Sequence, residues 1–589
     1  MRLIVPYVGN MQPAVSRIAQ LAGFLGIRCE NRALSGAVAA GDTGAIHAGD
    51  CLCIHPDVVQ AWCAYTGRPV ADVSALVEGY SQLLVYGLRA GAIDCALVQA
   101  LSGGRLQSIE PVNGGSPYTC SKDAREFCGS FAGLTFGRAD STNDHVFASA
   151  AAVCLIEPQI LIDDKPFVVL IRERGMTAVF VAGEELADLD MAAGDTPLTE
   201  YFSRFVPYAM ALRYLAGDAC WRPIQALAAV VIDDPLLRTK YGFLNFRSLL
   251  SMTEKHNFHA AIGFIPHNFR RNSRRVVRLF LENPERLSIC FHGNDHTQGE
   301  FASPDSRFLN LLLWVATKRM ALHQKRTGLA CDPVMVFPQG KFSTEAMKAL
   351  RSHNFYAAVN TVPHPAHAPA SLTLRELAQP GVLRYGGFPL FLRKPVDKIR
   401  PEDIAFNVFF GRPVLIVEHH QDFEDEERLT SLVNEINSII PEMQWTSLAA
   451  VTSQSLLYRR APDGLQEFRA YAGTVKIPID ASADRRCFVE WRVSMDPAEI
   501  AGVAANGRPC SFERIEGSLR TTIELSAGQS VTLAVIHAPG DPDQRTLDLK
   551  WKAKAFLRRR LSEFRDNYLY RNDGILKAAR AVQRRFSRA

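Results

Sequence analysis

The sequence predicts an α/β protein with a parallel sheet or barrel at its centre. At least five short apolar runs follow one another between residues 228 and 420, and segments with helical periodicity, such as 274–281 and 308–323, lie between them. Each run ends in Pro, Gly or residue types that bind metals and protons. The carboxyl ends of parallel strands meet at one rim, so chemistry is expected there.

Residues 1–215 show a simpler alternation of strands and helices. The pattern predicts a helix at 12–25 and strands at 3–8, 83–86, 151–156, 167–171 and 177–181. This predicts an open α/β domain, which distantly resembles flavodoxin-like and amidotransferase-like domains. No Gly-rich phosphate motif and no nucleophile-elbow Cys accompany it. We therefore expect a structural or substrate-recruiting role. A helix-like segment, 197–215, leads to a hinge at Trp221.

The second region, residues 222–455, contains the most informative motifs. One apolar run stops at Asp233-Asp234, and another stops at His292-Gly-Asn-Asp-His296. On one helical turn, a spacing of four would point both histidines the same way. Asp-Asp-Pro is more often a turn, and histidine pairs occur by chance, but together at strand ends they favour a metal site. One Asp and two His leave positions open for water and substrate.

These residues carry a family resemblance. Ile232-Asp233-Asp234 and His292-x-x-x-His296 resemble the first two motifs of the polysaccharide deacetylases (NodB-homology domain, carbohydrate esterase family 4), over about 228–453. The resemblance implies a distorted β/α barrel with Asp233 as general base. It also implies that Asp234, His292 and His296 hold one divalent ion, with zinc as the expected metal.

The later motifs of this family are weaker in the chain. The run before Pro338-Gln-Gly340 resembles the family's Arg-x-Pro-Tyr loop, although its Arg and Tyr have no match. A backbone donor near this loop would hold the oxyanion, which makes Pro338 and Gly340 candidates for substrate binding. Leu415-x-Val417-x-His419 resembles the last motif, whose His is the general acid. Strand alternation favours His419 over His420 as catalytic residue, but a bulge would exchange them.

Three further side chains are expected near the same rim. Arg238, Tyr241 and Arg393 are candidates for contacts with sugar hydroxyls or an anionic group of the substrate. The alternative for each is an ordinary surface or packing role.

Two smaller regions follow the barrel. Residues 463–548 contain short alternating apolar runs separated by turns, which predicts a small β-sandwich. Residues 549–589 predict a basic tail of two amphipathic helices. Between Lys550 and Ala589 we count thirteen Lys or Arg and three Asp or Glu, a net charge of +10. Apolar residues at 557, 561, 564 and 568 follow helical spacing. The tail is expected to meet an anionic membrane surface, this protein itself or an acidic partner protein. No nucleic acid partner is expected.

Composition excludes several protein classes. Apolar residues make up 47% and charged residues 22% of the chain, as in globular proteins. No apolar run is long enough for a membrane span, and the first residues do not read as a signal peptide. The thirteen Cys show no disulfide framework. We therefore expect a cytoplasmic protein. It could also associate peripherally with the inner face of the membrane.

The function predicted from these features is a metal-dependent hydrolase. It would remove an N-acyl (acetyl) group from an amino sugar in a glycan or glycan precursor. One alternative is a glycoside hydrolase that pairs Asp233 with Asp422 or Asp295. The other is a non-catalytic scaffold in polysaccharide biosynthesis.

Overall fold

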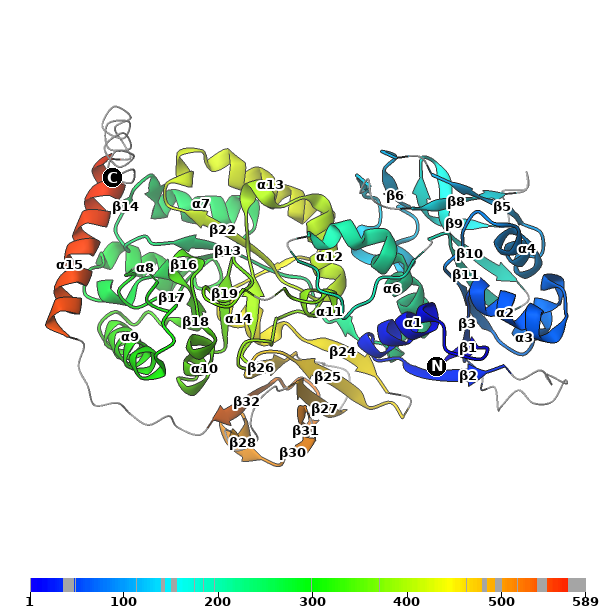
Figure 1. Cartoon of the computed structure of the whole chain (residues 1–589). Coiled ribbons are helices and arrows are strands. Elements are labelled where there is room, and N and C mark those ends of the chain that lie inside the picture. The colour runs from blue at the N-terminus through cyan, green and yellow to red at the C-terminus, as the bar shows by residue number, and fades with distance from the viewer. Residues whose placement is uncertain are drawn as a thin grey trace.

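The structure is a computed structural model. It describes residues 2–34, 47, 49–112, 114–138, 143–149, 156–173, 175–183, 185–194, 196–297, 299–369, 371–461, 463–478, 485–492, 500–515, 517–537 and 548–569. Nearly all of the predicted strand at 151–156 and the second predicted tail helix lie outside these residues. The N-terminal region and the tail helix lie at opposite ends of the molecule, with the barrel between them (Figure 1).

The N-terminal region is built on a sheet that is parallel in one half and antiparallel in the other. Its order is β2-β1-β3-β4-β11-β10-β9-β6-β7. The pairings from β2 through β4 to β11 are parallel and the remaining ones are antiparallel. The strands are β1 (Arg2–Tyr7), β2 (Arg28–Ala33), β3 (Cys51–Ile54), β4 (Gln82–Val85), β6 (Tyr118–Cys120), β7 (Thr135–Phe136), β9 (Glu157–Ile162), β10 (Lys165–Glu173) and β11 (Met176–Val181).

Helices cover this sheet and join it to the barrel. They include α1 (Pro13–Phe24), α2 (Pro56–Thr66), α4 (Ala92–Leu101) and α6 (Phe202–Ala216). Helix α6 packs on the barrel helix α12 (Pro401–Phe410), where the rings of Phe205 and Phe410 stack with centroids 4.8 Å apart. The N-terminal core therefore continues into the barrel.

The central sheet is parallel throughout its recorded pairings. Its order is β20-β19-β18-β17-β16-β13-β22-β21. Strand β13 is buried at every position, so both of its faces are covered and its run of apolar residues is continuous. The strands are β13 (Leu227–Asp233), β16 (Ala260–Phe264), β17 (Leu287–His292), β18 (Asp332–Val336), β19 (Ala357–Asn360), β20 (Leu390–Leu392), β21 (Lys394–Pro395) and β22 (Val414–His419).

One short segment brings the two edges of this sheet together. Strand β20 pairs with β19 at one edge and β21 pairs with β22 at the other. Only Arg393 separates these two strands in the sequence. The sheet therefore curves into a nearly closed barrel, and the predicted fold class is confirmed.

Helices between the strands cover the outside of the barrel. The predicted helices at 274–281 and 308–323 are present as α8 (Arg274–Glu282) and α9 (Ser306–Thr327). Asp305 caps the start of α9, where its carboxylate accepts hydrogen bonds from two backbone N–H groups, and Gly328 ends it at a φ of +78°. The others are α7 (Phe246–His256), α10 (Thr344–Ser352), α13 (Glu426–Ile439) and α14 (Leu448–Gln454).

Two smaller sheets enclose a separate apolar core after the barrel. Their orders are β12-β24-β25-β27-β31-β30 and β26-β32-β28-β29. Side chains such as Val489, Leu519, Val475 and Leu533 fill the space between them. The strands are β12 (Arg222–Pro223), β24 (Leu457–Arg460), β25 (Gln466–Ala470), β26 (Thr474–Ile477), β27 (Arg485–Arg492), β28 (Ile500–Ala505), β29 (Arg508–Cys510), β30 (Glu513–Ile515), β31 (Ser518–Leu525) and β32 (Val531–His537).

The tail forms one long helix against the barrel. Helix α15 (Leu549–Phe564) continues into a π-helical turn at Arg565–Leu569 and lies along the side of the barrel that carries α8 (Figure 1). Within the described ranges, no helix combines the length and the apolar character that a membrane span needs.

Candidate metal centre and active site

The two adjacent carboxylates lie at the carboxyl end of β13 and contact different partners. Asp233 is the last residue of the strand, and Asp234 follows it with a φ of +81°. A positive φ is strained for a residue with a Cβ, and such strain concentrates at functional sites. The neighbouring strand carries Gly263, where a Cβ would come within 2.9 Å of Asp233 Oδ1. The glycine therefore leaves room for the first carboxylate.

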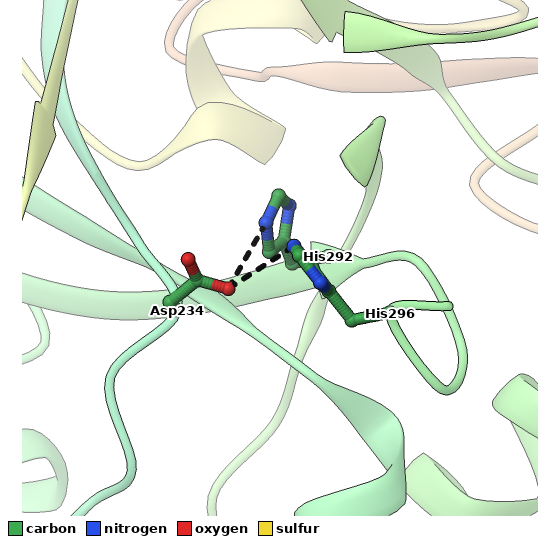
Figure 2. Close-up of side chains that lie close together, drawn as sticks. All are labelled: Asp234, His292 and His296. Atoms are coloured by element: carbon green, nitrogen blue, oxygen red, sulfur yellow. Dashed lines mark ion pairs between the residues drawn. The ribbon is translucent and has the colours of Figure 1, made fainter. Parts of the chain in front are cut away.

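Asp234 lies beside the two predicted histidines (Figure 2). Its Oδ1 atom is 3.6 Å from His292 Nε2 and 3.2 Å from His296 Nε2. One ligand atom from each of the three residues lies within 4.8 Å of the others. Across the described part of the chain, this is the one group of three or more His, Cys, Asp or Glu residues with such spacing. The structure thus brings the predicted metal ligands together.

These three side chains fit a small divalent ion. Ligands about 2.1 Å from a tetrahedral zinc ion lie about 3.4 Å apart, close to the separations from Asp234 Oδ1. That oxygen is buried, and no described residue donates a hydrogen bond to it. His292 Nδ1 lies 3.0 Å from the carbonyl oxygen of Val336, to which it donates its proton, and its Nε2 atom faces Asp234.

Glu300 supports the loop that carries His296. Its carboxylate is 2% exposed and accepts hydrogen bonds from the backbone N–H groups of residues 294, 295, 296 and 297, over 2.7 to 3.3 Å. His296 itself adopts a φ of +55° in this loop. The expectation of one helical turn containing both histidines is therefore wrong, because His292 ends strand β17 and His296 lies in the loop beyond it.

The surroundings of Asp234 and His296 favour the protonation states that bind a cation. Burial acts to raise the pKa of Asp234, but His296 and His292 outweigh it and hold that pKa well below its usual range. Burial lowers the pKa of His296 to about 4. Metal binding requires an ionised carboxylate and neutral imidazoles, which Asp234 and His296 supply at neutral pH.

Arg393 pairs with Asp233 across the barrel. Its Nη1 donates to Asp233 Oδ1 at 2.8 Å and its Nη2 to Oδ2 at 2.6 Å, and each residue is 4% exposed. Burial acts to raise the pKa of Asp233, whereas Arg393 and His292 together lower it. Arg393 was predicted to contact substrate, but both of its terminal nitrogens are directed at Asp233. It therefore fixes the orientation of the Asp233 carboxylate.

His419 lies beside Asp233 on the neighbouring strand and remains accessible. The two residues are register partners, and the His419 side chain is 48% exposed. Asp422 accepts a hydrogen bond from the backbone N–H of His419 at 2.8 Å, and its carboxylate lies 3.7 Å from the His419 Nδ1 atom. Asp422 raises the pKa of His419 against the opposing effect of burial. The geometry thus places an accessible imidazole beside the predicted base.

His420 has a different environment from its neighbour. It is 1% exposed, and its Nε2 atom lies 3.5 Å from Asp566 of the tail. The ring also meets Tyr241 edge-on, with centroids 4.8 Å apart. Tyr241 is itself buried and donates its hydroxyl hydrogen to Asp566 at 2.8 Å. His420 was predicted as the alternative catalytic acid and Tyr241 as a substrate contact, but both are buried beneath the tail, where Asp566 is their polar partner.

The remaining predicted residues lie on loops at the same rim. Pro338 is buried and faces Gly293, where a Cβ would come within 2.4 Å of its Cγ atom, so it packs the loop and does not face solvent. Gly340 has a φ of +67°, and its carbonyl accepts a hydrogen bond from Asn360 at 2.9 Å. Arg238 is exposed, and its side chain makes no recorded polar contact with another described residue.

The tail contributes groups to this rim that sequence reasoning missed. Trp551 donates its indole N–H to Asp295, next to His296, at 2.9 Å. Arg559 is 6% exposed, and its charge helps to lower the pKa of Asp234. The sequence signal was the basic character of the tail, but nothing local indicates where the tail packs.

The carboxylates that a glycoside hydrolase would need are already engaged. Asp295 is 1% exposed and contacts His267 at 2.8 Å and Arg319 at 2.7 Å, in addition to Trp551. Asp422 contacts His419, as described above. Neither Asp295 nor Asp422 is therefore free to act with Asp233 as the second catalytic carboxylate of a glycoside hydrolase.

No protein-family model and no curated protein matches the chain. Among solved structures, the carbohydrate deacetylase Agd3 is similar at 10% identity over 91% of this chain and 98% of its own, with a TM-score of 0.47. A family 4 carbohydrate esterase from Streptomyces lividans, in complex with acetate, is 9% identical over 38% of this chain and 92% of its own, with a TM-score of 0.23. A family 4 acetyl xylan esterase from Clostridium thermocellum, in complex with a cobalt ion, is 13% identical over 38% of this chain and 89% of its own, with a TM-score of 0.25. The structural neighbours of the chain thus include carbohydrate deacetylases and esterases.

Proposed function

We propose that the barrel removes an N-acyl group, acetyl foremost, from an amino sugar in a glycan or glycan precursor. The observation that carries the proposal is the convergence at one rim of the metal-ligand triad, the paired base Asp233 and the accessible His419. The amino sugar follows from the resemblance of the Asp233-Asp234 and His292-x-x-x-His296 motifs to polysaccharide deacetylases.

Asp234, His292 and His296 would hold the ion, for which zinc is the expected metal. A divalent ion bound there supplies a Lewis acid that polarises the amide carbonyl and makes water a better nucleophile. Asp233 accepts a proton from the attacking water, and the bidentate contact with Arg393 keeps its carboxylate ionised and oriented. The backbone near Gly340 is a candidate to hold the developing oxyanion.

His419 donates a proton to the departing amine, which is the more difficult half of amide hydrolysis. Its raised pKa keeps the ring protonated nearer to neutral pH, and its exposure lets a substrate approach. We assign this role to His419 and not to His420, which is buried against Asp566. A cytoplasmic site of action on a lipid-linked or nucleotide-linked sugar is part of the proposal.

The test measures metal content and acetate release for the wild type and a His292→Ala, His296→Ala double variant. We expect about one divalent ion per chain in the wild type. The variant should lose that ion and at least about 10³-fold in rate, because metal stabilisation of the transition state is worth several kcal/mol. A His256→Ala, His353→Ala variant is the matched control, since His256 ends helix α7 and His353 follows helix α10, both outside the triad.

Three results would contradict the proposal. A wild-type chain that binds no zinc or cobalt would remove the metal centre. Activity that persists without metal would favour a mechanism with two carboxylates. A fully metal-loaded chain without turnover on any acylated amino sugar would favour a scaffold role.

A further inference from the structure

Helix α15 is held on the barrel by polar contacts from one face. Glu563 accepts two hydrogen bonds from Arg271, at 2.6 and 2.7 Å, and Trp551 donates to Asp295. Just beyond the helix, Asp566 accepts from Tyr241 and Asn567 from the backbone N–H of Gly242. These contacts extend from one end of the helix to the turn beyond it. The orientation of α15 about its own axis is therefore fixed.

The opposite face of α15 presents large apolar side chains to solvent. The residues with their exposed fractions are Leu549 79%, Phe556 56%, Leu557 60%, Leu561 61%, Phe564 54% and Tyr568 64%. At 3.6 residues per turn, the five within the helix, the apolar arc, lie on one side of it, together with Lys550 and Arg560, and buried Ala555 lies on the other side. Contiguous exposed apolar surface of this kind marks an interaction site.

Positive charge surrounds this apolar arc. Helix α15 contains six Lys or Arg residues and one acidic residue, Glu563, which is paired with Arg271. Lys552, Lys554 and Arg560 are all exposed, and the sequence beyond residue 569 adds further Lys and Arg. Lys552 and Lys554 are the cationic flanks of the apolar side chains, and Lys550 and Arg560 lie among them. This combination is complementary to a bilayer that carries anionic lipids.

The same charges disfavour a second copy of the chain as the occupant. Two copies of this face would bring their cationic flanks together, and like charges at close range repel. An anionic lipid surface can bury the apolar side chains and pair with the basic ones at the same time.

We propose that the outward face of α15 binds an anionic membrane surface. The apolar arc enters the headgroup region, and the lysines and arginines contact anionic lipid headgroups. Because the inner face of α15 contacts Asp295, in the loop that carries His296, bound protein presents the side of the catalytic rim to the bilayer. This docking does not depend on the proposed hydrolysis.

The experiment is flotation of the full chain with two kinds of vesicle. One contains phosphatidylcholine mixed with phosphatidylglycerol, and the other contains phosphatidylcholine alone. We expect the wild type to float with the anionic vesicles only, and less so as salt rises. A Phe556→Ser, Leu561→Ser, Phe564→Ser variant should lose at least about 100-fold in vesicle affinity, because three apolar side chains no longer enter the lipid.

The matched control replaces three exposed apolar residues away from α15. They are Tyr65, at 63% exposure, with Ile515 at 44% and Ile536 at 41%, and each is changed to Ser. This control should bind like the wild type. A second test variant, Lys550→Glu, Lys554→Glu, Arg560→Glu, keeps the apolar arc and should also lose binding to the anionic vesicles. Circular dichroism verifies that every variant is folded.

Several outcomes would overturn the proposal. They are wild-type binding retained by both α15 variants, equal wild-type binding to neutral vesicles, and no binding to either vesicle. A dimer in light scattering that the serine variant dissociates, without vesicle binding by the wild type, would show that a second copy occupies the face.

Discussion

Two buried histidines at the carboxyl ends of parallel strands show how differently the two α/β regions use the same position. His55 follows β3 in the N-terminal region and is 5% exposed, and His292 ends β17 in the barrel and is 2% exposed. Burial lowers the pKa of His55 to about 4. Burial also acts on His292, but Asp233 and Asp234 outweigh it and raise its pKa.

The difference lies in what each ring contacts. His55 Nδ1 accepts a hydrogen bond from the backbone N–H of Asp57 at 3.2 Å, which caps helix α2, and its ring packs on Tyr86. His292 faces Asp234 with one nitrogen and the carbonyl of Val336 with the other. A strand end alone therefore does not make a site; the facing carboxylates Asp233 and Asp234 distinguish the surroundings of His292 from those of His55.

The largest expected effect tests the barrel side of this comparison. An Asp233→Asn variant should lose about 10² to 10⁴ in kcat because the attacking water has no general base. Its metal content should remain that of the wild type, since Asp233 is not in the triad. Acetate release and metal analysis on the same preparation measure both. A rate within tenfold of the wild type would remove Asp233 from the mechanism.

An intermediate effect concerns the pH dependence of the rim. Asp422 raises the pKa of His419, so an Asp422→Asn variant should lower it. His419 then loses its proton at a lower pH, and the basic limb of the kcat/KM profile should shift to lower pH. His419→Gln should remove that limb and lose about 10²-fold or more in kcat. If the limb stays in place in Asp422→Asn, another group supplies the proton.

The smallest effect tests the N-terminal side of the comparison. His55→Ala should lower the stability of the N-terminal region by about 2 kcal/mol, through the lost helix cap and the space left beside Tyr86. Catalysis and metal content should not change. Thermal unfolding and acetate release are the measurements, and loss of activity in a folded variant would show that the two histidines do not differ in the way described here.

The sequence predicted those features that local patterns encode. Apolar runs indicated the strands, and their abrupt polar ends indicated Asp233, Asp234 and His292. Arg393 and Asp233 are 160 residues apart, so no periodicity could pair them. Glu300 was missed for another reason, because a carboxylate that accepts backbone hydrogen bonds leaves no ligand spacing to recognise.

The tail is a second case in which the sequence predicts an element but not how it packs. Its apolar spacing predicts an amphipathic helix, and α15 is a helix as far as residue 564. An apolar stripe is expected to face the protein, yet here Glu563 and Asp566 make the contacts and Leu557 and Phe564 face solvent. Which face of a helix packs depends on its partners, Arg271 and Tyr241, which lie about 300 residues earlier.

The segment that joins the two edges of the barrel sheet also determines when the site assembles during folding. Arg393 lies between β20 and β21, so the guanidinium that neutralises Asp233 arrives only when that segment joins both edges of the sheet. Before then the carboxylate of Asp233 lacks its bidentate partner, and a buried charge without its partner is costly. Ring closure and assembly of the base are therefore one event. A chain in which this segment does not join the two edges would hold Asp233 without Arg393 beside it.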